Sequence, residues 1–166
     1  MGAARDYLEA MARLRDSQPS MRLHGSRYPS YEHLVLAVGR EWTPAERPRG
    51  VRSGRVKECF RNAFRLAESR PDLTYVEGWA TYHIPVHHAW TVDAEGVVVD
   101  PTWRPGPDGG VWAMRDYFGV PMPLDYVRRV QLETRVHGVF FNSVETLHRD
   151  PADYLPDTLG KGVEES

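Results

Sequence analysis

The spacing of apolar residues changes abruptly near residue 70, and this change limits the folds open to the chain. Between residues 56 and 69 apolar side chains recur at i, i+3, i+4 and i+7, which predicts a helix with one buried stripe. The stripe consists of Phe60, Ala63, Phe64 and Ala67. From Thr74 the pattern alternates and is rich in β-branched and aromatic residues, which predicts three successive antiparallel strands. We therefore expect an α+β fold in which this helix packs on an antiparallel β-sheet.

The segments on either side of this region have weaker patterns. Before it, capping residues and apolar periodicity predict N-terminal helices. These elements are an amphipathic helix at 4–16, a second helix from Ser30 to about Gly39 or Trp42, one short helical turn at 43–46 and an exposed loop at 47–55. After it, the predicted elements are a loop at 104–110, a short helical segment at 111–118, a strand at about 126–133, an apolar run at 139–141 and a polar tail from about 156.

The composition is ordinary for a soluble globular protein, with 41% hydrophobic and 27% charged residues and a formal net charge of −2. This balance gives no indication of a nucleic-acid-binding or membrane-binding surface. One cysteine excludes an internal disulfide, and residues 1–13 lack the apolar core of a secretion signal, so we expect a cytoplasmic protein.

Cys59 is that single cysteine, and it stands at the head of the striped helix. His88 and Asp100 follow on the predicted strands. A thiol, an imidazole and a carboxylate are the groups of a nucleophile, its general base and the residue that orients the base. The helix N-terminus would favour a thiolate, and its free N–H groups could stabilise an oxyanion. Each residue alone would more often be structural, but their order predicts a cysteine-dependent acyl-transfer enzyme.

The turn at residues 93–96 decides whether His88 and Asp100 can meet. If residues 94–96 form a three-residue loop with Gly96 in the left-handed conformation, Asp93 pairs with Val97. Asp100 then becomes a diagonal neighbour of His88 on the same face. A four-residue loop would turn Asp100 away, and the glycine at the third loop position favours the first register.

Four short runs carry a resemblance to a known family. They are Cys-Phe-Arg-Asn-Ala at 59–63, Tyr-Val-Glu-Gly-Trp-Ala at 75–80, His-Ala-Trp at 88–90 and Val-Asp-Pro-Thr at 99–102. Together they resemble the core of the transglutaminase-like superfamily, the papain-like cysteine-fold enzymes. The resemblance covers about residues 55–103. It implies that Cys59 is the nucleophile, that His88 is its base and that Asp100 orients the histidine.

The sequence departs from papain-like relatives in one place. These relatives commonly carry a glutamine a few residues before the nucleophile as an oxyanion donor, and residues 53–58 contain none. Trp42, Asn62 or a second backbone N–H could supply this donor. Further candidates for the substrate-lining surface are Glu77, Trp90 and Trp103, of which Glu77 could instead be a salt-bridge partner.

We expect the chain to hydrolyse an amide, peptide or isopeptide bond through a thioester on Cys59, without a cofactor. Its substrate would be a peptide, a protein or a small amide or acyl compound. Transfer of the acyl group to an amine is the alternative reaction, and a non-catalytic or zinc-binding module is the contrasting class. Zinc-binding atoms are available on His83, His87, His88, Glu77, Asp100 and Cys59. Because their spacing fits no zinc motif, no metal is predicted.

At 166 residues the chain is long enough for one hydrophobic core and short for two. We therefore expect a single domain over residues 1–166. Its parts would be an N-terminal helical part at about 1–54, a catalytic core at about 55–141 and a frayed tail at about 156–166.

Overall fold

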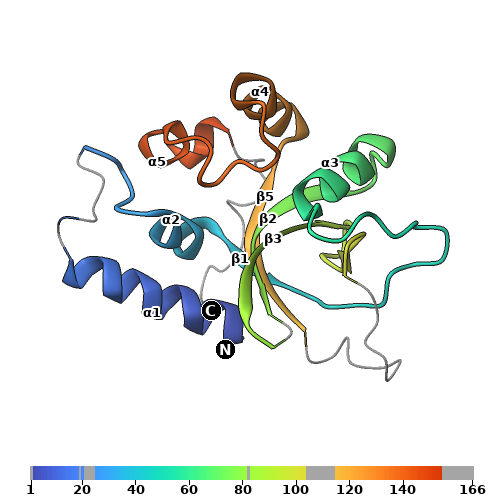
Figure 1. Ribbon diagram of the computed structural model, residues 1–166, viewed down its shortest axis with the longest axis horizontal. Helices are drawn as coiled ribbons and strands as arrows, with labels where there is room; N and C mark the ends of the chain where they lie inside the picture. The colour runs from blue at the N-terminus through green and yellow to red at the C-terminus, as the bar shows by residue number, and fades with distance from the viewer. Residues whose placement is uncertain (1, 19, 21–24, 82, 104–114, 155–166) are drawn as a thin grey trace, which may run out of the picture.

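The computed structural model describes residues 2–18, 20, 25–81, 83–103 and 115–154. At its centre lies a five-stranded sheet in the order β1-β5-β2-β3-β4, in which every pair of neighbours is antiparallel (Figure 1). The strands are β1 (Arg40–Trp42), β2 (Thr74–Thr81), β3 (Pro85–Val92), β4 (Val98–Val99) and β5 (Asp116–Met122). The expected α+β class and the antiparallel sheet are confirmed.

The two edge strands of the sheet approach each other, so the sheet curls toward a closed barrel. Thr43, just after β1, forms a parallel bridge with Val97, just before β4. The backbone N–H of Thr43 donates to the carbonyl of Gly96 at 3.1 Å, and that of Val98 donates to the carbonyl of Thr43 at 2.9 Å. The curl gives the sheet an inner and an outer face, and successive residues of a strand point to opposite faces.

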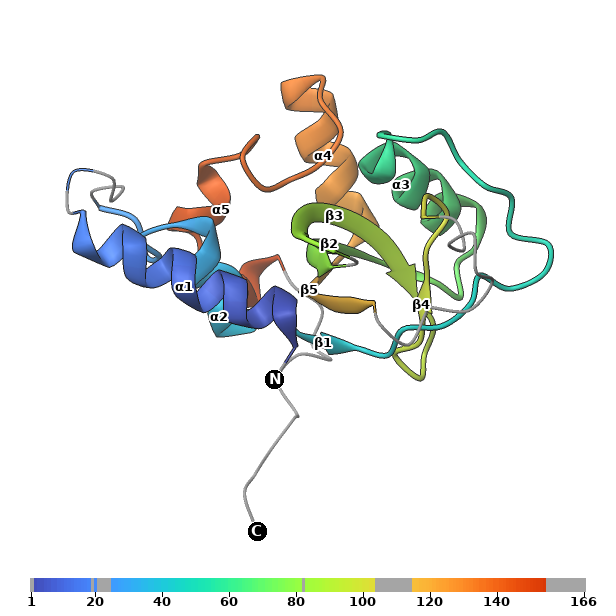
Figure 2. The same ribbon diagram turned by 60° about the horizontal axis from the view of Figure 1, so that its bottom comes forward.

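The helices cover the outer face of the sheet (Figures 1 and 2). They are α1 (Ala3–Ser17), α2 (Tyr31–Val38), α3 (Cys59–Ser69), α4 (Leu124–Thr134), α5 (Glu145–His148) and the 3-10 helix at Pro151–Asp153. The predicted helix at 4–16 and the striped helix are confirmed as α1 and α3. Within the described residues, no helix is long and apolar enough to cross a membrane.

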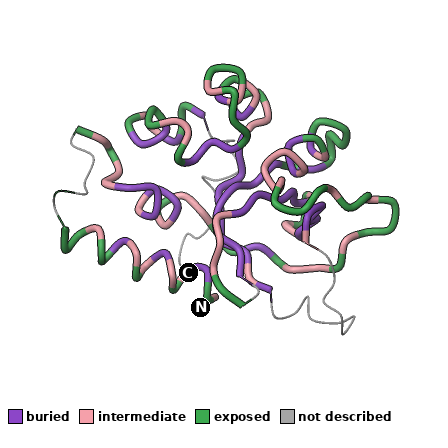
Figure 3. Tube along the Cα trace, viewed as in Figure 1, coloured by how far each residue is buried: buried purple, intermediate pink, exposed green. Residues whose placement is uncertain are grey.

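The described residues form two hydrophobic clusters, one on each face of the sheet. The outer cluster joins all five α-helices to β2, β3 and β5, and its largest side chains include Tyr75, Trp79 and Phe140. The inner cluster consists of Trp42, Val76, Ala80, Trp90, Val92, Val98 and Tyr117. Figure 3 shows the result, with the central strands almost continuously buried and the helices buried along one side. The sheet is therefore a rigid layer, suited to holding polar groups in fixed positions.

The second helix is confirmed with the earlier of its two expected ends, because α2 runs to Val38 with Gly39 as its C-cap, and residues 40–42 form β1 against β5 instead of extending the helix to Trp42. The short helical turn expected at 43–46 is wrong. Residues 43–46 form no helical turn, because the backbone of Thr43 is engaged in the bridge that closes the curl. Tertiary pairing outweighs the local capping signal here.

Strand β5 was not predicted from the sequence. A helix was expected over 111–118, but residues 116–118 belong to β5, and residues 111–114 lie outside the described part of the chain. Gly119 and Pro121 are unfavourable inside strands and mask the pattern. Gly119 is required by packing, because a Cβ atom there would lie 2.7 Å from the ring of Trp90. The loop predicted at 104–110 and the tail from 156 also lie outside the described residues.

Residues 124–134 form helix α4, so the strand predicted at about 126–133 is wrong. Tyr126, Val127 and Val130 are its buried residues, and their spacing of one and four positions fits one face of a helix. Their aromatic and β-branched side chains suggested a strand, but packing against the outer cluster decides the outcome.

Candidate active site

Cys59 is the first residue of α3, three positions later than the predicted helix start at residue 56. The reason is Lys57, whose φ of 67° places it in the left-handed region and outside any regular helix. Cys59 therefore stands at the positive end of the helix dipole, where backbone N–H groups lack intrahelical acceptors. Its thiol is neither disulfide-bonded nor fully buried.

A pocket of about 550 Å³ opens at Cys59. The start of α3 forms one wall, the first half of β3 forms a second, and the segment after β4 forms a third. The lining residues are Val56, Lys57, Cys59, Phe60, Val86, His87, His88, Thr102 and Trp103. The thiol and His88 thus share one cavity, and Trp103 closes the side next to His88.

The β3–β4 hairpin brings His88 to Asp100 in the register expected from the sequence. Thr91 pairs with Val99, and the N–H of Asp93 donates to the carbonyl of Val97 at 3.1 Å. Gly96 has a φ of 79°, the left-handed conformation that the three-residue loop requires. His88 Nε2 lies 2.8 Å from Asp100 Oδ2 as a result, and both side chains are almost completely buried.

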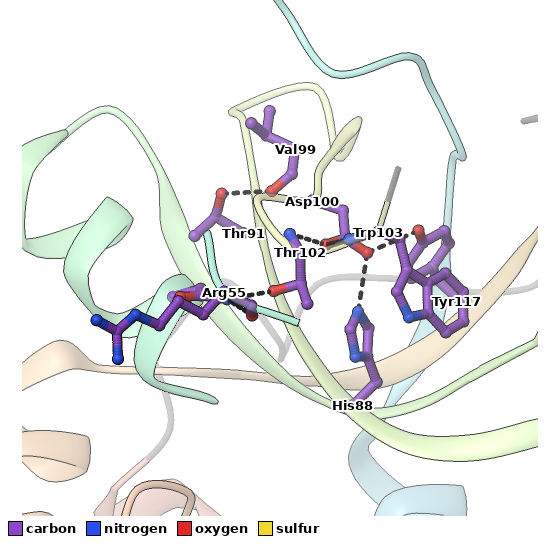
Figure 4. A network of polar contacts seen from close by, with 9 residues as sticks. Arg55, His88, Thr91, Val99, Asp100, Thr102, Trp103 and Tyr117 are labelled. Carbon is purple, nitrogen blue, oxygen red and sulfur yellow. Dashed lines mark hydrogen bonds and ion pairs between the residues drawn. The ribbon is translucent and has the colours of Figure 1, made fainter. Parts of the chain in front are cut away.

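Asp100 is itself held by three further donors. The backbone N–H groups of Thr102 and Trp103 donate to its Oδ1 at 2.7 and 3.0 Å. The hydroxyl of Tyr117, on β5, donates to Oδ2 at 3.0 Å. Figure 4 shows the carboxylate of Asp100 among His88, Tyr117 and Thr102, with Thr102 on the side away from Tyr117. These contacts fix the direction in which Asp100 faces His88.

The electrostatics favour an ion pair between His88 and Asp100. Burial lowers the pKa of His88, but the charge of Asp100, its hydrogen bond and the contact with Cys59 outweigh burial and raise it to about 9. Burial raises the pKa of Asp100, but His88 and the two backbone N–H donors hold it below its ordinary value. At neutral pH the pair is therefore an imidazolium beside a carboxylate.

The His88 ring is positioned so that its two nitrogens have different partners. Nε2 faces Asp100, which leaves Nδ1 for the thiol of Cys59, and a side-chain hydrogen bond with Cys59 contributes to the raised pKa of His88. Trp103 stacks on the ring with centroids 4.5 Å apart and planes 20° apart. The ring is consequently fixed by the carboxylate at one edge and by Trp103 on one face.

No protein-family model, curated protein or solved structure matches the chain. The chemical interpretation of Cys59 and its neighbours therefore rests on their geometry. Within the described residues, no group of three or more His, Cys, Asp or Glu side chains is arranged to hold a metal ion.

The two side chains suggested as oxyanion donors are engaged elsewhere. Trp42 donates its indole N–H to the carbonyl of Gly119 at 3.0 Å, inside the inner cluster. The amide of Asn62 donates to the carbonyl of Arg55 at 2.8 Å and to Thr102 Oγ1 at 3.0 Å. Asn62 thus fastens the segment before α3 to the segment after β4, and neither residue is brought to the pocket wall.

The remaining candidates lie at different depths. Trp103 lines the pocket, whereas Trp90 is fully buried below His88, with ring centroids 6.1 Å apart. Glu77 is also fully buried, and His87 Nε2 lies 3.1 Å from its Oε1. Glu77 therefore reaches the pocket only through His87.

The sequence did not lead us to three residues that belong to the candidate site: Thr102, His87 and Tyr117. Thr102 could have been found, because an aspartate followed by proline and threonine is typical of a turn in which the carboxylate accepts backbone N–H groups. His87 was considered only as a metal ligand, although it lines the pocket. Tyr117 had no local signal, since it lies on the concealed strand β5.

Proposed function

We propose that this protein is a cysteine hydrolase of transglutaminase-like or papain-like type that cleaves an amide, peptide or isopeptide bond through a thioester on Cys59. One observation carries the proposal: a buried His88–Asp100 pair, 2.8 Å between Nε2 and Oδ2, shares a pocket with a cysteine at a helix N-terminus. This combination supplies a nucleophile, a base and a group that orients the base.

Because the pKa of His88 lies near 9, the reaction would begin with the proton of the Cys59 thiol already on His88 Nδ1, so that a thiolate faces an imidazolium. The thiolate then attacks the carbonyl carbon, forms the C–S bond and moves the carbonyl electron pair onto oxygen. The oxyanion collapses as the C–N bond breaks, and His88 gives its proton to the leaving amine. Water attacks the thioester with His88, now neutral, as the base, and breaking the C–S bond releases the carboxylic acid and restores the thiolate and the imidazolium.

Asp100 has two tasks in this sequence. Its carboxylate fixes the ring so that Nδ1 faces the thiol, and its negative charge stabilises the imidazolium that forms when His88 accepts a proton. The raised pKa of His88 supports this assignment, because it reports how strongly Asp100 and Cys59 favour the protonated ring over the effect of burial.

The pocket walls favour an acyl donor with apolar groups next to the scissile bond. Val56, Phe60, Val86 and Trp103 supply apolar walls, and among the described lining residues Lys57 is the one exposed cationic residue. A peptide or protein with apolar side chains near the cleaved bond fits these walls. An amine could replace water as the acceptor without any change in the first half of the reaction.

The proposal is tested with p-nitrophenyl acetate, which acylates active thiols and releases a coloured product. The native protein should form an acetyl thioester at Cys59, located by peptide mass mapping, and should then hydrolyse it. Cys59→Ala should abolish both steps while its circular dichroism and melting temperature stay near those of the native protein.

Three other results would overturn the proposal or change the reaction. A Cys59 that reacts only after denaturation would make it a core residue and end the enzyme proposal. One tightly bound zinc per chain, with loss of stability on chelation, would instead indicate a zinc-binding module. Added amine that captures the acetyl group faster than water does would shift the proposal from hydrolysis to acyl transfer.

A further inference from the structure

His87 and His88 are neighbours on β3, and each ring is held through Nε2 by a buried carboxylate. The distances are 3.1 Å from His87 to Glu77 and 2.8 Å from His88 to Asp100. Neighbouring strand residues point to opposite faces of a sheet. Both rings nevertheless line the pocket that contains Cys59. The pocket thus has an oriented imidazole on two sides, and the mechanism above uses only one of them.

The hydrogen bonds of Glu77 determine which nitrogen of His87 is free. Each carboxylate oxygen of Glu77 has two neighbours: Oε1 has His87 Nε2 and the N–H of Phe140, and Oε2 has the hydroxyl of Tyr75 and the N–H of Val139. An ionised carboxylate has about four acceptor sites and no donor. His87 Nε2 therefore carries a hydrogen and donates it, which leaves Nδ1 for a ligand.

The ring of His87 is fixed by aromatic neighbours as well as by Glu77. Its centroid lies 4.8 Å from that of Phe60, 5.0 Å from that of Trp79 and 5.0 Å from that of Phe141. Cys59 directly precedes Phe60, and both residues line the same pocket as His87 and His88.

Acyl transfer at Cys59 needs a second oxyanion donor, which the assignments so far do not supply. The first donor is the backbone N–H of Cys59 at the start of α3. Trp42 and Asn62 are engaged elsewhere, Thr102 Oγ1 accepts from Asn62, and Trp103 lies flat on His88. Because the oxyanion and the leaving group are different substituents of one carbon, the donor must approach from another direction than His88.

We propose that His87 is that donor: its Nδ1–H, together with the backbone N–H of Cys59, forms the oxyanion hole of the thioester chemistry. This inference rests on the function proposed above. When the thiolate forms the C–S bond, the carbonyl π pair moves to oxygen and accepts a hydrogen bond from Nδ1–H. This role requires a hydrogen on each nitrogen of His87, one for Glu77 and one for the oxyanion, and the buried carboxylate 3.1 Å from Nε2 is the group that stabilises such a ring.

Two reagents distinguish stabilisation of the oxyanion by His87 from stabilisation of the Cys59 thiolate. p-Nitrophenyl acetate acylates Cys59 through a tetrahedral oxyanion. Iodoacetamide alkylates it by displacing iodide at a saturated carbon, so no oxyanion forms. His87→Phe, which fills the space without an N–H, should slow acylation by about 10²-fold and leave alkylation nearly unchanged. His87→Gln, whose amide can donate to both Glu77 and the oxyanion, should retain most of the acylation rate.

The controls fix the interpretation. His88→Ala should slow both reactions, and His148→Phe, on α5, should slow neither. Melting temperatures are recorded for all variants, and His87→Leu serves as the donor-free variant should His87→Phe not fold. Equal loss of both reactions in the donor-free variant, or normal acylation, would overturn the role of His87. A native Cys59 inert to both reagents would instead overturn the proposed function itself.

Discussion

Nε2 of His88 and Oδ2 of Asp100 lie 2.8 Å apart in the interior of the protein, in a contact that the β3–β4 hairpin creates and a turn after β4 completes. Because Oδ1 of the same carboxylate is taken by two backbone N–H groups, only Oδ2 faces the ring. The contact therefore sets both the charge and the tautomer of His88, and four predictions concern it and its neighbours.

The first prediction concerns Asp100→Asn. The amide oxygen should keep the bonds to the N–H groups of Thr102 and Trp103, which places the NH₂ group opposite His88 Nε2. Nε2 must then accept, so the proton moves to Nδ1 and the ring no longer offers a base to Cys59. We expect kcat for p-nitrophenyl acetate to fall by up to about 10⁴-fold, the effect of this change in a catalytic triad.

The measurement compares kcat and melting temperature of the two proteins. A melting temperature close to that of the native protein would confirm that the fold survives. Near-equal kcat values would remove Asp100 from the site and leave at most a pair of Cys59 and His88.

The second prediction concerns Tyr117→Phe. Burial and the charge of Asp100 raise the pKa of Tyr117, so its hydroxyl remains a donor to the carboxylate. Loss of a hydrogen bond to a buried charged group costs about 1.5–3 kcal/mol. For a chain of this length that corresponds to a fall in melting temperature of roughly 3–12 °C. We expect kcat to fall as well, but far less than in Asp100→Asn.

Tyr154→Phe is the matched control for this variant. Its buried hydroxyl donates to the carbonyl of Thr146 at 3.1 Å, on the far side of the outer cluster. It should lower the melting temperature without changing kcat. A Tyr117→Phe protein with the same pattern would show that Tyr117 supports only the fold.

The part of the site that the sequence made predictable is the part built by local geometry. The striped helix, the hairpin and the left-handed Gly96 are signals within a few residues, and together they place Asp100 beside His88. Tyr117 could not be found this way, because it comes from β5, whose Gly119 and Pro121 obscure the alternation. Only the pairing of β5 with β1 and β2 makes it a strand.

The same contrast explains the errors in the helices. In α4 the intrinsic preference of Val127 and Val130 for strands is outweighed by packing on the outer cluster. For Glu77 the sequence predicted only part of the arrangement. The alternation with Tyr75 and Trp79 predicted the face on which Glu77 lies, but its hydrogen-bond partners Val139 and Phe140 lie more than sixty residues away. Contacts of this kind carry no periodic signal.

The third prediction is a loss of stability at alkaline pH that depends on His88. The pKa of its ring is about 9 in the folded protein against 6.5 for an unperturbed histidine. The folded state therefore binds the proton more tightly, so the stabilisation is complete below pH 6.5 and is lost as the pH rises through about 9. A difference of this size corresponds to about 3 kcal/mol.

The test is urea unfolding of the native protein and of His88→Gln between pH 6 and 10. The native protein should lose stability across this range, and the variant should lose markedly less. Asp100 acts at the other end: because its pKa is lowered, its stabilisation is lost only as the pH falls below the ordinary carboxyl range. Parallel curves for the two proteins at alkaline pH would contradict the assigned ion pair.

The last prediction concerns Glu77→Gln, which replaces one carboxylate oxygen of a buried residue by an NH₂ group. Each oxygen of Glu77 accepts from one backbone N–H, that of Phe140 for Oε1 and that of Val139 for Oε2. Whichever way the glutamine amide turns, its NH₂ group therefore faces a backbone donor, and one buried N–H loses its acceptor. Such a loss at a charged, buried acceptor costs at least about 1–3 kcal/mol. We expect a lower melting temperature and faster hydrogen exchange at Val139 and Phe140, with acylation slowed because His87 loses its support.

Glu68→Gln, which removes one partner of an exposed pair with Arg128, is the matched control and should leave all three measurements unchanged. If exchange at Val139 and Phe140 is the same in both variants, Glu77 does not hold this segment, and the position of His87 must depend on its aromatic neighbours alone.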